Sequence, residues 1–165
     1  MAFEITNYFF ENLTKLINSN DEQAISELFS EVHYADIAEV LDQVSFDEAI
    51  YIIKLLDSEK TSEILTELDE DIREKILKNL SAKEIAEEVE EMDSDDAADI
   101  IGELSEERQE KVIDALEDDE LVADIKELLS YEDDTAGALM AKELVKVYET
   151  WTVAGCMRRI RGQAK

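Results

Sequence analysis

The chain has 165 residues, and its 44 acidic and 16 basic side chains give a formal net charge of −28, which disfavours nucleic acid and anionic membrane surfaces as partners and favours cations or basic proteins. Hydrophobic residues make up 45% of the sequence, enough to build a core, so disorder is not expected for most of the chain. No apolar run approaches the roughly 20 residues of a membrane span, and the lone cysteine, Cys156, cannot form an internal disulfide, which fits a soluble protein in a reducing cytosolic setting.

Two helices are predicted before residue 33. Within residues 1–18, apolar side chains recur at the spacing of a helix that buries one face. Asn20 and Asp21 then offer side-chain oxygens that can cap a second helix, which we expect to end near Val32.

Residues 33–128 repeat every 12 residues, in eight units whose ninth and twelfth positions are always apolar. The units begin at His33, Ser45, Asp57, Asp69, Ser81, Asp93, Ser105 and Glu117. Most of these residues can cap a helix, and Ser45 with Glu48 and Ser81 with Glu84 have the spacing of a capping box. Each unit therefore predicts a helix of about nine residues and a tight connection, and helices that short need neighbours to be stable.

Stacked units of this kind predict an all-α superhelix, or solenoid, of short antiparallel helices rather than a compact bundle. The fifth positions of the units have a longer period, in which two apolar residues are followed by two mostly polar ones. The array therefore reads as a 48-residue block of four helices used twice.

The repeat stops after Leu129, and residues 131–141 are expected to be a connector. Residues 144–147 alternate as in a short strand, and Thr152 is placed to cap a helix that runs to about Arg161. One strand and one helix cannot close a core. Residues 142–165 therefore predict a short incomplete α/β tail, the start of a second domain, that is mobile or packs on a partner chain.

Catalytic constellations are nearly absent, so we expect no enzyme activity. The single histidine, His33, stands where a helix cap is expected, and Cys156 has no histidine near it in the sequence. Phosphate-binding glycine loops, HExxH and paired CxxC motifs are missing. A hydrolase that uses paired carboxylates is disfavoured, because the sequence has no motif that indicates an active-site pocket.

The clearest chemical signal is a run of carboxylates, because residues 84–107 hold twelve acids and no base. With Asp93 as the cap, Asp95 and Asp96 fall in the first turn of a helix, where the helix dipole favours negative charge. Asp99 follows Asp95 by four residues on the same face, where like charges repel each other. The remaining apolar residues of this unit predict a core-facing side opposite this pair.

Such a pair is either a solvated face, the commoner meaning of a charge run, or half of a site for a hard cation. An EF-hand is excluded, because it would need glycine at Ala98 and glutamate at Leu104. Any site must be completed across helices or from another domain. Magnesium suits that arrangement, since it keeps its waters and often touches only one or two carboxylates.

Three phrases, HYADIAEVL (33–41), EEMDSDDAADIIGEL (90–104) and YEDDTAGALM (131–140), resemble the cytosolic N-terminal domain of the MgtE family of magnesium channels and transporters. Residues 143–161 resemble the first strand and helix of the paired CBS domains that follow in that family. The resemblance implies an N-terminal superhelical domain at residues 1–130, a connector at 131–141 and a truncated CBS start at 142–165.

The resemblance implies a right-handed superhelix that senses magnesium at the cytoplasmic face of the cell membrane, as part of a full-length homodimeric transporter. In that family, magnesium bridges acids of this domain to acids of the CBS domains and connecting helices, which closes the pore of the transmembrane domain when cytosolic magnesium is high. Carried over to this sequence, the bridging positions are Asp95 and Asp99, and Glu63 is the aligned acid of the third unit. The exit motif departs from the family, because residues 136–138 read A-G-A where members often have A-G-G.

The alternative is a helical-repeat scaffold that binds a basic protein partner, since the flagellar motor switch protein FliG has a loosely similar architecture. The D-S-D-D-A-A-D and A-G-x-L-M motifs favour the transporter. They predict a regulatory domain with a weak magnesium site that is shared with domains absent from this chain.

Overall fold

The computed structural model describes residues 5–132, 135–142 and 147–163, and within them the chain forms eleven α-helices and no strand. The helices are α1 (Asn7–Ser19), α2 (Glu22–Ser30), α3 (Tyr34–Gln43), α4 (Phe46–Ile53), α5 (Ser58–Glu67), α6 (Glu70–Asn79), α7 (Ala82–Val89), α8 (Ser94–Gly102), α9 (Glu106–Ile113), α10 (Asp119–Leu128) and α11 (Val153–Gln163). The prediction of an all-α array is confirmed. Except for Val147, which has no regular structure, the strand predicted at 144–147 lies outside the described residues.

Each predicted unit folds as one helix, from α3 to α10. In the first seven units the opening residue is the N-cap, and both predicted capping boxes form, at Ser45 with Glu48 and at Ser81 with Glu84. The eighth helix begins one residue late, because Asp118 is its cap and not Glu117. The shorter aspartate reaches the amides of the first turn better than glutamate does.

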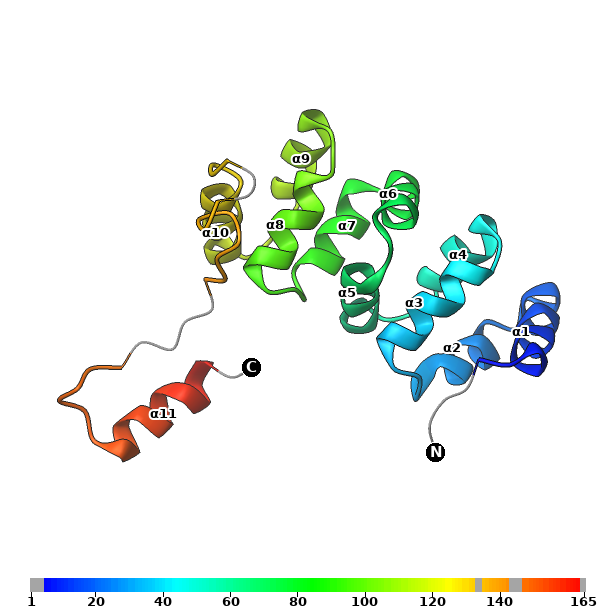
Figure 1. Cartoon of the computed structure of the whole chain (residues 1–165), viewed down its shortest axis with the longest axis horizontal. Coiled ribbons are helices and arrows are strands. Elements are labelled where there is room, and N and C mark those ends of the chain that lie inside the picture. Colours follow the sequence, from blue (N-terminus) through cyan, green and yellow to red (C-terminus); the bar gives the residue numbers. More distant parts are fainter. Residues whose placement is uncertain (1–4, 133–134, 143–146, 164–165) are drawn as a thin grey trace.

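Most helices of the array pack on the helix after next, so the chain builds two rows (Figure 1). One row runs through α3, α5, α7 and α9, and contacts of the second row join α4 to α6 and α8 to α10. All eight ninth-position residues are buried, and the twelfth-position residues are buried or half-buried. The repeat therefore supplies one continuous core, while the right-handed sense of the superhelix stays a prediction.

Basic side chains tie helices that are far apart in the sequence. The Lys60 ammonium donates to the carbonyls of Phe29 and Ser30, at 2.7 Å each. Arg108, 48 residues later, donates to the carbonyls of Leu77 and Leu80, at 2.9 and 2.7 Å. Both side chains bind carbonyls at the end of an earlier helix, where the regular hydrogen bonds of the helix run out, and Phe29 and Leu77 also accept from the amides of Val32 and Leu80.

The C-terminal helix α11 lies apart from the array in Figure 1. Its predicted cap is confirmed, because Thr152 Oγ1 accepts a hydrogen bond from the amide of Gly155 at 3.2 Å. Large apolar side chains of this region are exposed, namely Val147, Tyr148, Trp151, Val153, Met157 and Ile160. That the tail is mobile or packs on a partner stays a prediction.

Within the described ranges, none of the helices combines the length and the apolar character that are needed to cross a bilayer.

Candidate functional site

Helix α8 carries the acids that the sequence analysis selected. Asp99 is exposed, whereas Asp95, one turn earlier, is half-buried, so it stays a prediction that both point outward together. The predicted core-facing residues Ala97, Ile100, Ile101 and Leu104 are all buried, and so are Ser94 and Ala98. The role of the two aspartates as magnesium ligands stays a prediction.

The local sequence of α8 concentrates negative charge at the start of the helix. Asp93 is the N-cap residue, but its carboxylate makes no capping hydrogen bond within the part of the chain that is described. Asp95 and Asp96 occupy the first turn, and α8 itself contains no basic residue. The helix dipole therefore stabilises these carboxylates, while their mutual repulsion stays in place.

A pocket of about 190 Å³ brings α5 to the start of α8. Its lining residues are Ser62, Glu63, Thr66, Glu91, Met92, Asp93 and Asp96. Glu63 therefore lies at the acidic end of α8, as the predicted site requires. The pocket is lined by Asp96, however, and not by Asp95 or Asp99.

The electrostatics of Asp96 show how closely these acids are grouped. Burial raises the pKa of this carboxyl most, and the charges of Asp95, Asp93, Asp99 and Glu63 raise it further. Sequence reasoning assigned Asp96 only to the helix dipole. Its position three residues after Asp93, which places both near one side of the helix, is the signal that could have identified it.

Within the described residues, no group of three or more histidine, cysteine, aspartate or glutamate side chains converges closely enough to hold a metal ion. The oxygen donors of Glu63 and the α8 acids fit the chemistry of Mg²⁺, which retains waters and often contacts only one or two carboxylates. Further ligands from another domain are required for a closed site, and their existence stays a prediction.

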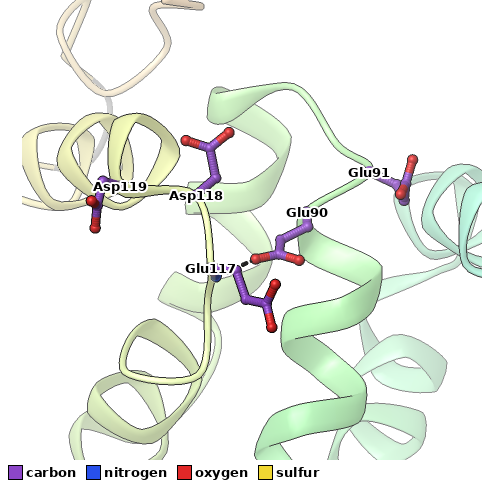
Figure 2. A pocket seen from close by; sticks show the side chains of 5 residues that line it. All are labelled: Glu90, Glu91, Glu117, Asp118 and Asp119. Atoms are coloured by element: carbon purple, nitrogen blue, oxygen red, sulfur yellow. Dashed lines mark hydrogen bonds between the residues drawn. The ribbon is translucent and has the colours of Figure 1, made fainter.

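A second acidic depression, of about 520 Å³, lies between the end of α7 and the start of α10 and is lined by Glu90, Glu91, Glu117, Asp118 and Asp119. Figure 2 shows that Glu90 and Glu117 lie side by side, with the Glu117 amide donating to the Glu90 carboxylate. Glu91 and Asp119 lie at opposite ends of the view. These carboxylates do not converge on one point, so they form a negative surface rather than a cage.

Glu88 on α7 is an acid that sequence reasoning did not distinguish from its neighbours. Burial, followed by the charges of Glu87, Asp57, Glu84 and Glu91, raises the pKa of Glu88 to about 7. Its buried Oε2 atom has no hydrogen-bond partner among the described residues. The period of the repeat alone does not show this, because it does not specify how deeply a polar position is covered.

Comparison with known proteins identifies the family. Residues 32–134 match the family described as the MgtE intracellular N domain. A crystal structure of the soluble part of a magnesium transporter is similar, with 25% sequence identity and a TM-score of 0.78 over 95% of this chain. The cytosolic domain of the Mg²⁺ channel MgtE in complex with ATP is 30% identical, with a TM-score of 0.83 over 92% of this chain.

This chain spans 62% of the length of each of those two structures. Among curated proteins, no sequence matches it. The family predicted from the three sequence phrases is confirmed by the match and by the shared all-α fold. The chain belongs to the family of the MgtE intracellular N domain.

Proposed function

We propose that this chain is the magnesium-sensing and gating domain of a magnesium transporter and lies on the cytoplasmic side of the membrane. The family match carries the assignment to a transporter. The grouping of Glu63 with Asp93 and Asp96 at the start of α8 supports a cation as the signal. The domain performs no catalysis of its own.

The proposed mechanism follows from the grouping of acids on α8, a helix that itself contains no basic residue. A second acidic surface brought against them repels them, until a divalent cation lies between the two and binds both. The cation therefore binds the closed arrangement more tightly than the open one, and this difference in affinity shifts the population toward closure. Magnesium fits because hard cations prefer carboxylate oxygens and water.

The partners in this proposal are the CBS domains and the transmembrane domain of a full-length, homodimeric transporter. The CBS acids complete the weak site that Asp95, Asp99 and Glu63 begin. The exposed apolar residues of α11 support a further domain beside this one, since such side chains in a row mark a surface that packs on another.

Thermal melting of this chain in millimolar MgCl₂, compared with NaCl of equal ionic strength, tests the cation-binding step. We expect magnesium to raise Tm more than sodium does, because only a specific cation binds by mass action beyond screening. Asp95→Asn and Asp99→Asn should remove most of that difference.

Asp71→Asn is the matched control, because Asp71 has the same place in the first turn of α6 as Asp95 has in α8. This variant should keep the magnesium response of the parent. If magnesium and sodium stabilise the parent equally, or if all three variants respond alike, the α8 face does not bind the cation specifically.

A further inference from the structure

The segment that follows α10, residues 135–142, is fastened to two helices of the array. The amide of Lys142 donates to Ser94 Oγ, in the first turn of α8, at 3.2 Å. The Lys142 ammonium forms an ion pair with Glu127 of α10, at 2.5 Å, and its side chain is only 17% exposed. This segment, called the strap below, therefore holds the ends of α8 and α10 together.

A close contact at the start of the strap depends on a glycine. A Cβ atom on Gly137 would lie 2.6 Å from the ring of Tyr131, so no other residue fits without displacing the ring. The hydroxyl of Tyr131 donates to the Glu127 carboxylate at 3.3 Å. Glu127 thus binds Lys142 at the end of the strap as well as Tyr131, whose ring lies against Gly137 of the strap.

Helix α8 offers small residues on the side toward the strap and α10. Ser94 and Ala98 are buried, and a Cβ on Gly102 would meet the Leu129 side chain at 3.6 Å. Spaced four apart, these three residues share one side of the helix. The strap and the acids of α8 are therefore neighbours, because Ser94 stands between Asp93 and Asp95 in the same turn.

We propose that the strap is coupled to the acidic face of α8, so that cation binding at this face sets how firmly the strap is held on α8 and α10. The inference rests on the proposed function. Repulsion among the α8 acids acts on the first turn, which contains the anchor Ser94. A divalent cation that neutralises these acids stabilises this turn and so keeps the strap closed. By linkage the coupling is reciprocal, and a strap that opens weakens cation binding.

Hydrogen exchange of the whole chain, in MgCl₂ and in NaCl of equal ionic strength, tests the coupling. The variants are Ser94→Ala, which removes the acceptor, and Lys142→Met, which removes the ion pair but keeps the amide and the apolar stem. Lys111→Met is the matched control, because Lys111 forms an exposed ion pair with Glu107 on α9. Equal exchange in α3 and α5 across all variants shows that each one folds.

In sodium, we expect amides 138–142 to exchange about tenfold faster in Ser94→Ala and Lys142→Met than in the parent, as for the loss of an anchoring bond. Lys111→Met should match the parent. In magnesium, exchange of both α8 and the strap should slow in the parent, and the two strap variants should lose part of the protection of α8.

Three outcomes would contradict the proposal, and they differ in whether the cation site is excluded as well. If magnesium slows exchange in α8 but leaves the strap unchanged, the cation site stands and the strap is not coupled to it. If magnesium changes neither α8 nor the strap, the cation site falls as well. Parent-like strap exchange in both variants in sodium would show that Ser94 and Lys142 do not hold the strap.

Discussion

Arg73 and Glu103 form a forked ion pair that joins α6 to the end of α8. Arg73 Nη2 lies 2.5 Å from Glu103 Oε1, and Arg73 Nε lies 3.0 and 3.2 Å from the two carboxylate oxygens. Arg73 Nη1 also donates to the carbonyls of Leu65 and Leu68, at 3.2 Å each. The two charged side chains are only 17% and 18% exposed, so one guanidinium links α5, α6 and α8.

Arg73→Met should lower the free energy of unfolding by about 2–4 kcal/mol, because it leaves Glu103 largely buried without its partner and two carbonyls without a donor. Urea unfolding measures the loss. Lys78→Met is the control, since Lys78 pairs with Glu74 at the surface, where the two side chains are 60% and 50% exposed. That variant should lose less than about 1 kcal/mol, and equal losses would contradict a special role for Arg73.

Glu88→Gln should stabilise the chain at alkaline pH and not at acidic pH. The folded state holds the pKa of Glu88 at about 7, above the ordinary value near 4.5, so the folded state binds the proton more tightly than the unfolded state does. The stability linked to this proton is complete below pH ~4.5 and is lost as pH rises through about 7. Above pH 7 the variant should be more stable by about 1–2 kcal/mol, after allowance for partial exposure.

The measurement for Glu88 is urea unfolding at several pH values from about 4.5 to 8.5. Glu87→Gln removes the same charge from the preceding residue, which is exposed, and is the control; the surface ion pair with Lys83 that it also removes contributes little. A similar gain in both variants would mean that the general repulsion of a highly acidic protein, and not the burial of Glu88, sets the pH dependence.

The two capping boxes differ in one contact, and their stabilities should differ accordingly. Glu84 accepts from the amide of Ser81 and from Lys54 of α4, and these bonds lower the pKa of Glu84 to about 2. In the other box, Glu48 accepts from Ser45 alone among the described residues. The contribution of Glu84 is therefore present above pH ~4.5 and is lost as pH falls toward 2.

At pH 7, Glu48→Gln should cost about 0.5–1 kcal/mol, and Glu84→Gln should cost a few tenths more, because it also loses an exposed ion pair. Chemical unfolding of both variants in the Lys54→Met background provides the check. There the two costs should become equal, and a difference that persists would exclude Lys54 as its source.

Lys60→Met and Arg108→Met should each cost about 1–2 kcal/mol, because each removes a charged donor from two carbonyls at the end of a helix. In a repeat array, interactions in separate units contribute almost independently. The double variant should therefore lose the sum of the two single losses in urea unfolding. A much larger or smaller loss would show that the two halves of the array are coupled beyond nearest neighbours.

The repeat made most of the helices predictable, because its ninth position must be buried in every unit and its first residue must cap a helix. Ile101 and Leu65 illustrate this, since each is fully buried and each follows from its place in the period. The cap at Asp118 departs from the period, because its aspartate side chain accepts from the amides of Glu120 and Leu121 in place of Glu117, the opening residue of the unit.

The site was predicted less completely than the fold, for the same physical reason. Asp95 and Asp99 share a face by helix geometry alone, but the approach of Glu63 to Asp96 depends on how α5 packs near the turn between α7 and α8. The bond from Lys142 to Ser94 spans 48 residues, and no local pattern reports such a pairing. Periodicity defines which face is buried, while packing decides which exposed groups meet.

Several basic side chains bind between helices of the array, and this affects how the array responds to salt. Lys60, Arg73, Arg108 and Lys142 are all bound to carbonyls or carboxylates between helices, while most acids of a chain with net charge −28 are left on the outside. Contacts between helices therefore hold the array together, while repulsion among the acids on its surface favours a longer array. Salt screens this repulsion beyond the Debye length, about 10 Å at 0.1 M, so the array should shorten as ionic strength rises.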